Sequence, residues 1–257
     1  MGGVTLEPRH PFDIIQEYDV RRGYLASRWQ AMHAQDPIPS TRLDHLGRKG
    51  YEVVDVLWPE VAADYVGTEV WASDIGKDHF RAVLTEVFNP QLNEKLRNYF
   101  MSPYTVLFWN ITQSGDDNPS LVWHCDAGPS CYLKMLVYLN RTEGATEVLD
   151  RPTTDLFKRI GYGYLNFEHR VDDIVDLGDK YRIEAKPERL SPDQGQAVLF
   201  EPSQVLHRGI YPKAETRWLM QIGIIPWLKP WDESFDDMYG FVAKNVGFGF
   251  PPVTGEA

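Results

Sequence analysis

Cysteine, long apolar runs and basic charge are all scarce in this sequence. Only two of its 257 residues are cysteines, Cys125 and Cys131, which argues against a disulfide scaffold and favours a reducing, cytoplasmic location. The longest apolar run, Trp218 to Leu228, contains Gln, Gly and Pro and is far shorter than the roughly 20 residues that span a bilayer. The N-terminal MGGVTLEPRH also has no apolar signal-peptide stretch. We therefore expect no association with a membrane.

The shortage of positive charge bears on the partner. The chain has 37 acidic and 26 basic residues, a net charge of −11, and such a balance repels a phosphate backbone unless basic residues are concentrated locally. The sequence shows no such concentration, so no nucleic-acid partner is expected. Apolar residues make up 43% and aromatic residues 13%, which predicts a globular protein with enough rings to line a pocket for a small molecule. The oligomeric state is left open.

Helical periodicity dominates the first hundred residues. Pro11 to Ala34 reads as one amphipathic helix, and Asp78 to Phe100 reads as a second helical stretch that breaks near Asn89 and Pro90. A strand is expected at Tyr51 to Leu57. We predict a single domain over residues 1–257, in which residues 1–103 are mostly helical, residues 104–227 form the catalytic core, and residues 228–257 form a tail that packs as a loop on the core or over its mouth.

After Pro103 the sequence changes to short β-branched and aromatic runs separated by Gly, Pro, Asn and Asp, which is typical of a sandwich or barrel. The count is close to the about eight strands of a jelly roll. The fold class is therefore mainly β with flanking helices. The expected strands are Tyr104 to Thr112, Ser120 to Asp126, Cys131 to Asn140, Glu147 to Asp150, Tyr181 to Lys186, Ala197 to Glu201, and Arg217 to Pro226.

Two histidines and one aspartate are the candidate metal ligands. His124 and Asp126 lie two residues apart in the run SLVWHCD, and the alternation of an extended strand places them on one side and Cys125 on the other. His207 follows the apolar run QAVLFEPSQVL and can face the same interior. Two imidazoles and one carboxylate suit a non-haem Fe(II), because they leave three positions for O2 and a chelating co-substrate.

A buried cation is expected ten residues later. Arg217 opens the apolar strand RWLMQIGIIP, and a charged residue that points inward there requires an anionic partner. A guanidinium group can bind a carboxylate through two parallel hydrogen bonds. A dicarboxylate co-substrate is the natural partner.

These segments resemble the Fe(II)/2-oxoglutarate-dependent dioxygenase superfamily, and are similar to its prolyl-hydroxylase and phytanoyl-CoA-hydroxylase groups. The likeness rests on HCD, LKMLVYLN (Leu133 to Asn140), GQAVLFEP, LHRG and the trailing arginine, over approximately Tyr104 to Trp227. It implies a double-stranded β-helix (jelly roll) with the N-terminal helices packed outside. It also implies Fe(II) held by His124, Asp126 and His207, with the distal carboxylate of 2-oxoglutarate bound by Arg217.

The sequence departs from the family pattern in one place. Many members have Ser or Thr two residues after the arginine to share the carboxylate, but this chain has Leu219. Strand alternation leaves Lys134 or Tyr132 as the replacement donor. Asn110, on the run TVLFWNIT, can bind the keto-acid end, as asparagines do in some relatives.

The resemblance implies hydroxylation of an unactivated C–H bond as the default, with release of succinate and CO2, and desaturation or ring chemistry stays open. Asp126 argues against the halogenases of the superfamily, in which a small residue replaces the carboxylate. We expect a small metabolite or an amino-acid-like substrate. Three alternatives stay open: hydroxylation of a protein side chain or of a carrier-bound acyl group, a cupin-type metal-binding jelly roll that does not use 2-oxoglutarate, and a scaffold protein that binds no iron.

Overall fold

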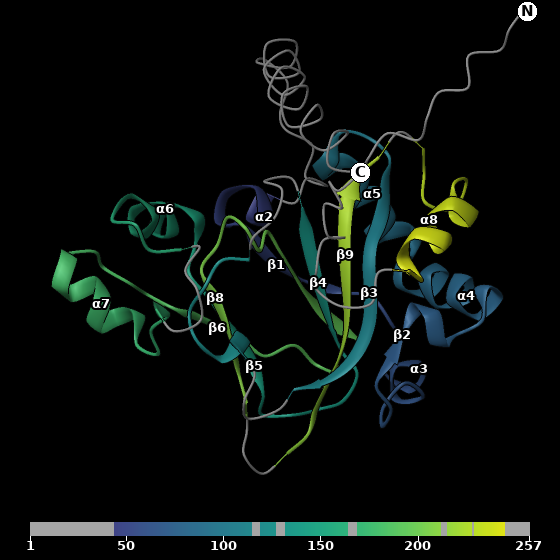
Figure 1. Ribbon diagram of the computed structural model, residues 1–257, viewed down its shortest axis with the longest axis horizontal. Helices are drawn as coiled ribbons and strands as arrows, with labels where there is room; N and C mark the ends of the chain where they lie inside the picture. The colour runs from purple at the N-terminus through teal and green to yellow at the C-terminus, as the bar shows by residue number, and fades with distance from the viewer. Residues whose placement is uncertain are drawn as a thin grey trace, which may run out of the picture.

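Two antiparallel sheets with helices packed on them make up the described part of the chain. The computed structural model describes residues 44–114, 119–126, 132–163, 169–211, 215–227 and 229–244. The large sheet has the order β1-β7-β4-β9-β3-β2 and the small sheet has the order β6-β5-β8 (Figure 1). The strands are β1 (Tyr51–Asp55), β2 (Val70–Trp71), β3 (Tyr104–Ser114), β4 (Leu133–Tyr138), β5 (Ala145–Val148), β6 (Glu188–Leu190), β7 (Gln196–Phe200), β8 (His207–Ile210) and β9 (Arg217–Pro226).

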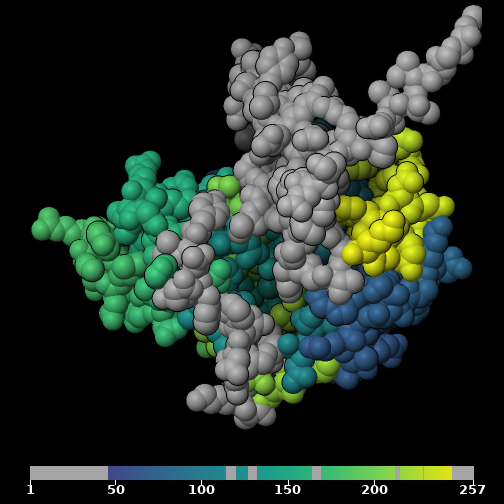
Figure 2. All heavy atoms as spheres, viewed as in Figure 1, coloured from purple at the N-terminus to yellow at the C-terminus, as the bar shows by residue number. Residues whose placement is uncertain are grey.

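The helices lie on both sides of this pair of sheets. They are α2 (Asp44–Lys49), α3 (Pro59–Ala63), α4 (Lys77–Val87), α5 (Pro90–Phe100), α6 (Arg151–Arg159), α7 (Ile174–Tyr181) and α8 (Phe235–Val242), with short 3-10 helices η1 (Ala72–Asp74) and η2 (Pro119–Leu121). Helices α3, α4 and α8 flank the large sheet, and α6 and α7 lie beyond the small sheet at the opposite end of the molecule (Figure 1). The space-filling view shows the same two ends of the molecule (Figure 2). Helices α6 and α7 are green, α3 and α4 are blue, and α8 is yellow.

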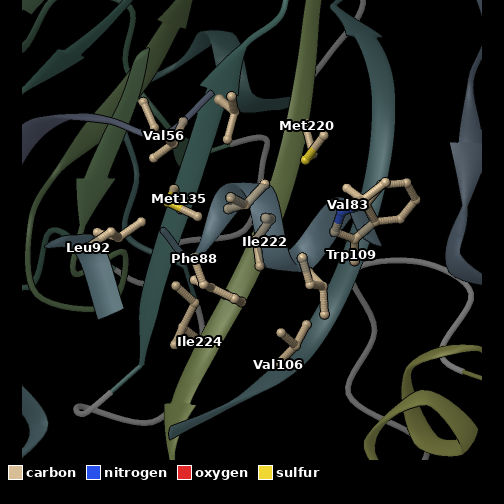
Figure 3. Packing of buried hydrophobic residues seen from close by; sticks show 14 of the residues in the cluster. Val56, Val83, Phe88, Leu92, Val106, Trp109, Met135, Met220, Ile222 and Ile224 are labelled. Carbon is tan, nitrogen blue, oxygen red and sulfur yellow. The ribbon is translucent and has the colours of Figure 1, made fainter. Parts of the chain in front are cut away.

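The main core lies between the large sheet and helices α4, α5 and α8. Alternate residues of the central strands enter it, such as Met135 of β4 and Ile222 of β9, and they meet Val83 and Leu92 from the helices (Figure 3). Leu92 is only 2% exposed, so its replacement by alanine is expected to cost about 2–5 kcal/mol. The expectation that helices cover the outside of the β core is confirmed for α4 and α5.

A second core lies between the two sheets. The intervening residues of β4, Leu136 and Tyr138, point into it together with Leu219 of β9 and Val148 of β5. The predicted alternation of β4 is thus confirmed, because its odd-numbered residues belong to the main core and its even-numbered residues face the small sheet. Polar residues on this inner face are enclosed between the sheets.

The break between α4 and α5 has a local cause. The side chain of Asn89 accepts a hydrogen bond from the Leu92 backbone nitrogen at 2.9 Å, and Pro90 occupies the first turn. A capping asparagine is worth about 1 kcal/mol, and proline at the start of a helix lacks only a hydrogen bond that the first turn cannot make. The break predicted at Asn89 and Pro90 is therefore confirmed.

Three expected elements differ from the structure. Tyr181 to Lys186 is not a strand: Tyr181 ends α7, and Asp173 caps that helix through Oδ1, which accepts from Val175 and Asp176. The strand expected at Ser120 to Asp126 is reduced to η2 and one isolated bridge at His124. The C-terminal tail, expected to be a loop, contains α8.

Two expectations are limited by the described range. The helix predicted at Pro11 to Ala34 lies outside the described residues. The described helices include none with the length and apolar character needed to cross a bilayer. The remaining expected strands occur with shifts of one or a few residues, and Arg217 to Pro226 occurs with the expected bounds.

Candidate metal centre

His124, Asp126 and His207 meet at one end of the space between the sheets. Their candidate donor atoms all lie within 4.8 Å of one another. Asp126 Oδ1 is 3.3 Å from Nε2 of His124 and 3.6 Å from Nε2 of His207. Donor atoms that bind one ion at right angles from about 2.1 Å lie roughly 3 Å apart. The three residues can therefore hold a metal ion once their donor atoms move closer together.

Backbone pairing brings the two histidines together. His124 and His207 form an isolated antiparallel bridge, in which the His124 nitrogen donates to the His207 carbonyl at 3.1 Å and the His207 nitrogen donates to the His124 carbonyl at 2.9 Å. The Asp126 nitrogen donates to the carbonyl of Pro202 at 2.8 Å. Two segments far apart in sequence thus carry their ligands at a fixed separation.

Each imidazole ring is oriented by a backbone carbonyl. Nδ1 of His124 lies 2.7 Å from the Val122 carbonyl, and Nδ1 of His207 lies 3.0 Å from the Val205 carbonyl. Since a carbonyl oxygen only accepts, both Nδ1 atoms carry the proton and both Nε2 atoms keep a lone pair. The second nitrogen of metal-binding histidines is commonly held in this way. Both rings are prepared to bind a cation through Nε2.

The protonation states also suit a cation. Burial and, second, the nearby His207 lower the pKa of His124 to about 4, against the opposing effect of Asp126. Burial raises the pKa of Asp126, but the ammonium group of Lys134 and the two neighbouring imidazole rings outweigh this effect and hold that pKa well below its usual range. At neutral pH the site therefore offers a neutral imidazole at His124 and an anionic carboxylate.

Lys134 and Tyr132 lie near the metal ligands and away from Arg217. Nζ of Lys134 donates to Oδ2 of Asp126 at 2.9 Å. Tyr132 is buried in a cluster with Leu107 and Ile225. Because β4 is antiparallel to β9 and pairs Leu133 with Ile224, Tyr132 and Lys134 lie at the end of the strand pair opposite Arg217. The structure does not bring either residue to the guanidinium group.

Tyr138 is the residue of β4 that reaches Arg217. The guanidinium carbon of Arg217 lies 5.9 Å from the centre of the Tyr138 ring, and Nη1 of Arg217 donates to the Ala145 carbonyl at 2.5 Å. The Tyr138 hydroxyl lies 3.0 Å from Oγ1 of Thr146. Burial lowers the pKa of Arg217, and Tyr138 partly opposes this shift. Tyr138 and Thr146 were not among the predicted donors, because their proximity depends on how β4 pairs with β9.

Asn110 is buried between the sheets with an unsatisfied amide. It is 1% exposed, and within the described ranges neither its Oδ1 nor its Nδ2 has a hydrogen-bond partner. It lies on β3 opposite Gln221 of β9. A buried amide without a partner costs about 1–3 kcal/mol, so the position is suited to a ligand that supplies both a donor and an acceptor, or to water.

Comparisons with known proteins identify the fold. No family model and no curated protein matches this sequence. Among solved structures, the epimerase SnoN in complex with Fe3+, alpha-ketoglutarate and nogalamycin RO is similar with a TM-score of 0.51 and 15% identity, covering 71% of this chain and 81% of that one. HygX from Streptomyces hygroscopicus, with nickel and 2-oxoglutarate bound, gives 0.51 and 13%, covering 76% and 89%. At such identities the likeness concerns the fold.

Proposed function

We propose that this chain is an Fe(II)- and 2-oxoglutarate-dependent oxygenase with a jelly-roll core, and that it hydroxylates an unactivated C–H bond of a small metabolite or an amino-acid-like substrate. The observation that carries the proposal is the group His124, Asp126 and His207, in which both imidazoles present Nε2 to the oxygen Oδ1 of one carboxylate. Such a donor set leaves one face of an octahedral ion open. The likeness to SnoN and HygX supports the jelly-roll assignment.

Each residue has a defined task in this proposal. Nε2 of His124, Oδ1 of Asp126 and Nε2 of His207 hold Fe(II). Arg217 binds the distal carboxylate of 2-oxoglutarate, with a hydroxyl from Tyr138 or Thr146 in place of the Ser or Thr that Leu219 replaces. When bound, Fe(II) and 2-oxoglutarate supply the activation of O2 that oxidises a C–H bond, while the keto acid is converted to succinate and CO2.

Asn110 has the second binding task. Its amide faces the inner side of β3 and has both a donor and an acceptor to offer. A carboxylate at the keto-acid end of the co-substrate would accept from Nδ2. Burial between two sheets removes competing water from these contacts, so each hydrogen bond to the co-substrate is stronger than it would be on the surface.

A small-molecule substrate is also supported by the fold relatives. The SnoN structure contains nogalamycin RO together with its iron and keto acid. A net charge of −11 disfavours a nucleic-acid substrate for this chain. The cytoplasmic location remains a prediction, to be checked by fractionation of expressing cells.

The test is an anaerobic titration of the apo-protein with Fe(II) and then with 2-oxoglutarate. The chelate gives a weak visible metal-to-ligand charge-transfer band, which should appear in the wild type, be absent in His124→Ala, and be present in the matched control His79→Ala, since His79 is an exposed residue of α4. Iron binding without the band would contradict the co-substrate assignment and favour a cupin-type site. Failure to bind iron would reject the proposal that this protein is an iron-dependent enzyme.

A further inference from the structure

The segment Trp123–Asp126 lies at the edge of the small sheet. Only its His124 backbone groups face β8, through the paired hydrogen bonds to His207. In an antiparallel ladder the backbone groups of the neighbouring residues point the other way, so those of Trp123 and Cys125 face away from the sheet. A strand edge exposes N–H and C=O groups that need a further partner, and this edge carries two of the three candidate metal ligands.

The described residues between β5 and β6, which we call the insertion (149–163 and 169–187), satisfy these outward groups. The Trp123 nitrogen donates to the Val171 carbonyl at 3.0 Å, and the Cys125 nitrogen donates to the Gly163 carbonyl at 2.9 Å. The Tyr162 hydroxyl donates to the Trp123 carbonyl at 2.8 Å. The insertion thus replaces the missing neighbouring strand on this side of the metal ligands.

The Tyr162 hydroxyl links two parts of the insertion to the segment that carries His124. Its hydroxyl oxygen also accepts a hydrogen bond from the Val171 nitrogen at 2.9 Å. One hydroxyl therefore joins the segment after α6, the segment before α7 and the carbonyl immediately before His124. Tyr162 is 7% exposed, so water does not readily replace these hydrogen bonds, and loss of the hydroxyl leaves polar groups without a partner.

Side chains of the insertion pack behind both ligand-bearing segments. Trp123 and Cys125 flank His124, Leu206 precedes His207, and all three are buried in one cluster with Phe157 and Tyr162. This cluster lies on the side opposite the metal ligands, because neighbouring residues of an extended segment alternate. The residues next to the two candidate histidine ligands, Trp123, Cys125 and Leu206, thus pack against side chains of the insertion.

Arg208 makes the corresponding contact beside His207. Its Nε and Nη2 each lie 2.8 Å from Oε2 of Glu147 on β5, and its Nη1 donates to the Asp172 carbonyl in the insertion at 2.6 Å. Its guanidinium carbon also lies 5.2 Å from the centre of the Trp123 ring. The two ligand-bearing segments are therefore tied to the same part of the insertion.

We propose that the insertion is a positioning element of the metal centre, and that the Tyr162 hydroxyl is the contact that keeps Trp123–Asp126 extended so that His124 and Asp126 point at one ion. This inference rests on the proposed function only in requiring that the three residues bind a metal. Tyr162 contacts neither metal nor co-substrate, and acts through the backbone of its neighbours. Loss of a hydrogen bond made directly to a ligand side chain typically lowers metal affinity about 10–100-fold; Tyr162 acts through the backbone next to the ligand, so we expect an effect at the lower end of this range.

The test is the affinity of the apo-protein for Co(II) alone, measured anaerobically through the visible spectrum of the bound ion. We expect Tyr162→Phe to bind Co(II) about tenfold more weakly than the wild type while its circular dichroism shows a folded apo-protein. Tyr181→Phe is the matched control, because Tyr181 ends α7 and is 47% exposed. It should bind Co(II) as the wild type does.

A second variant distinguishes an effect on the metal centre from a general loss of stability. Arg208→Lys retains the charge but cannot contact Glu147 and the Asp172 carbonyl together, so it should also weaken Co(II) binding. If Tyr162→Phe or Arg208→Lys lowers the melting temperature but leaves the Co(II) affinity within twofold of the wild type, the contact is only structural and the inference is overturned. Wild-type protein that binds Co(II) but gives no charge-transfer band with Fe(II) and 2-oxoglutarate would reject the proposed function and leave this inference standing.

Discussion

Lys134 Nζ lies 2.9 Å from Oδ2 of Asp126, the carboxylate oxygen that points away from the two histidines. Oδ1 of the same carboxylate is the atom nearest to both Nε2 atoms. One oxygen is thus held by an ammonium group, and the other is available to a metal. This arrangement favours monodentate coordination by Asp126, which is what leaves a full face of an octahedral ion open.

The first prediction concerns this pair. Lys134→Met removes the ammonium group while keeping a side chain of similar length. The carboxylate of Asp126 is then no longer held in one orientation, so metal affinity should fall about tenfold. The measurement is Co(II) affinity at neutral pH. Lys95→Met is a suitable control, because Lys95 forms only a partly exposed ion pair with Glu52 at 3.5 Å. Unchanged Co(II) affinity in Lys134→Met would show that Asp126 needs no such support.

Arg217 is expected to determine co-substrate affinity and not metal affinity. Arg217→Lys retains the charge but loses the second parallel hydrogen bond, so the affinity for 2-oxoglutarate should fall about 10–100-fold, or about 1.4–2.8 kcal/mol. Calorimetric titration of the metal-loaded protein with 2-oxoglutarate measures it. Arg141→Lys, at an exposed position, should bind like the wild type. Equal loss of metal affinity in Arg217→Lys would point to a general structural role.

Gly209 offers a test of the same site without removal of the charge. A Cβ atom at Gly209 would lie 2.9 Å from Nη2 of Arg217, which is too close, so Gly209→Ala should displace the guanidinium group. We expect the affinity for 2-oxoglutarate to fall several-fold, with Co(II) affinity retained. Gly240→Ala is the control, because nothing lies within 4 Å of a Cβ there. Full co-substrate affinity in Gly209→Ala would mean that the guanidinium position is not critical.

Elements with a strong local pattern could be predicted from the sequence. Strand β9 was predicted with its observed bounds, Arg217–Pro226, because its apolar residues are continuous between turn residues and bury both faces. The start of α5 was predicted because Asn89 and Pro90 form a local capping signal. In both cases the information lies within a few neighbouring residues.

Elements that depend on distant contacts were missed. The Trp123–Asp126 segment reads as a strand, but its pairing partners are His207 on one side and the insertion on the other. The proximity of Tyr138 to Arg217 follows from the register in which Tyr138 pairs with Leu219. Alternation places Tyr138 on the correct face, but a register between strands far apart in sequence has no local signature.

Asn110 is expected to lower the stability of the apo-protein and to strengthen the binding of 2-oxoglutarate. Within the described ranges its amide has no partner, so Asn110→Leu should raise the free energy of unfolding of the apo-protein by about 1 kcal/mol and weaken 2-oxoglutarate binding about tenfold. Urea unfolding and calorimetry measure the two effects. Asn140→Leu should instead destabilise, because Asn140 bonds the Thr216 carbonyl and the Trp218 nitrogen. A destabilised Asn110→Leu protein would show that a partner of this amide exists in the free protein.

Cys125 reports on the contact between the insertion and the metal ligands. It is 2% exposed, and burial raises the pKa of its thiol to about 12, so very little of it is present at pH 8 as the thiolate, the form that reacts with iodoacetamide. In a Cys131→Ser background, the native protein should resist alkylation at pH 8 and react within minutes after unfolding in urea. Tyr162→Phe should speed labelling of the native protein if the insertion separates more easily from the segment, and mass spectrometry measures the modified fraction. Rapid alkylation of the native Cys131→Ser protein would contradict the closed packing of the insertion against Cys125.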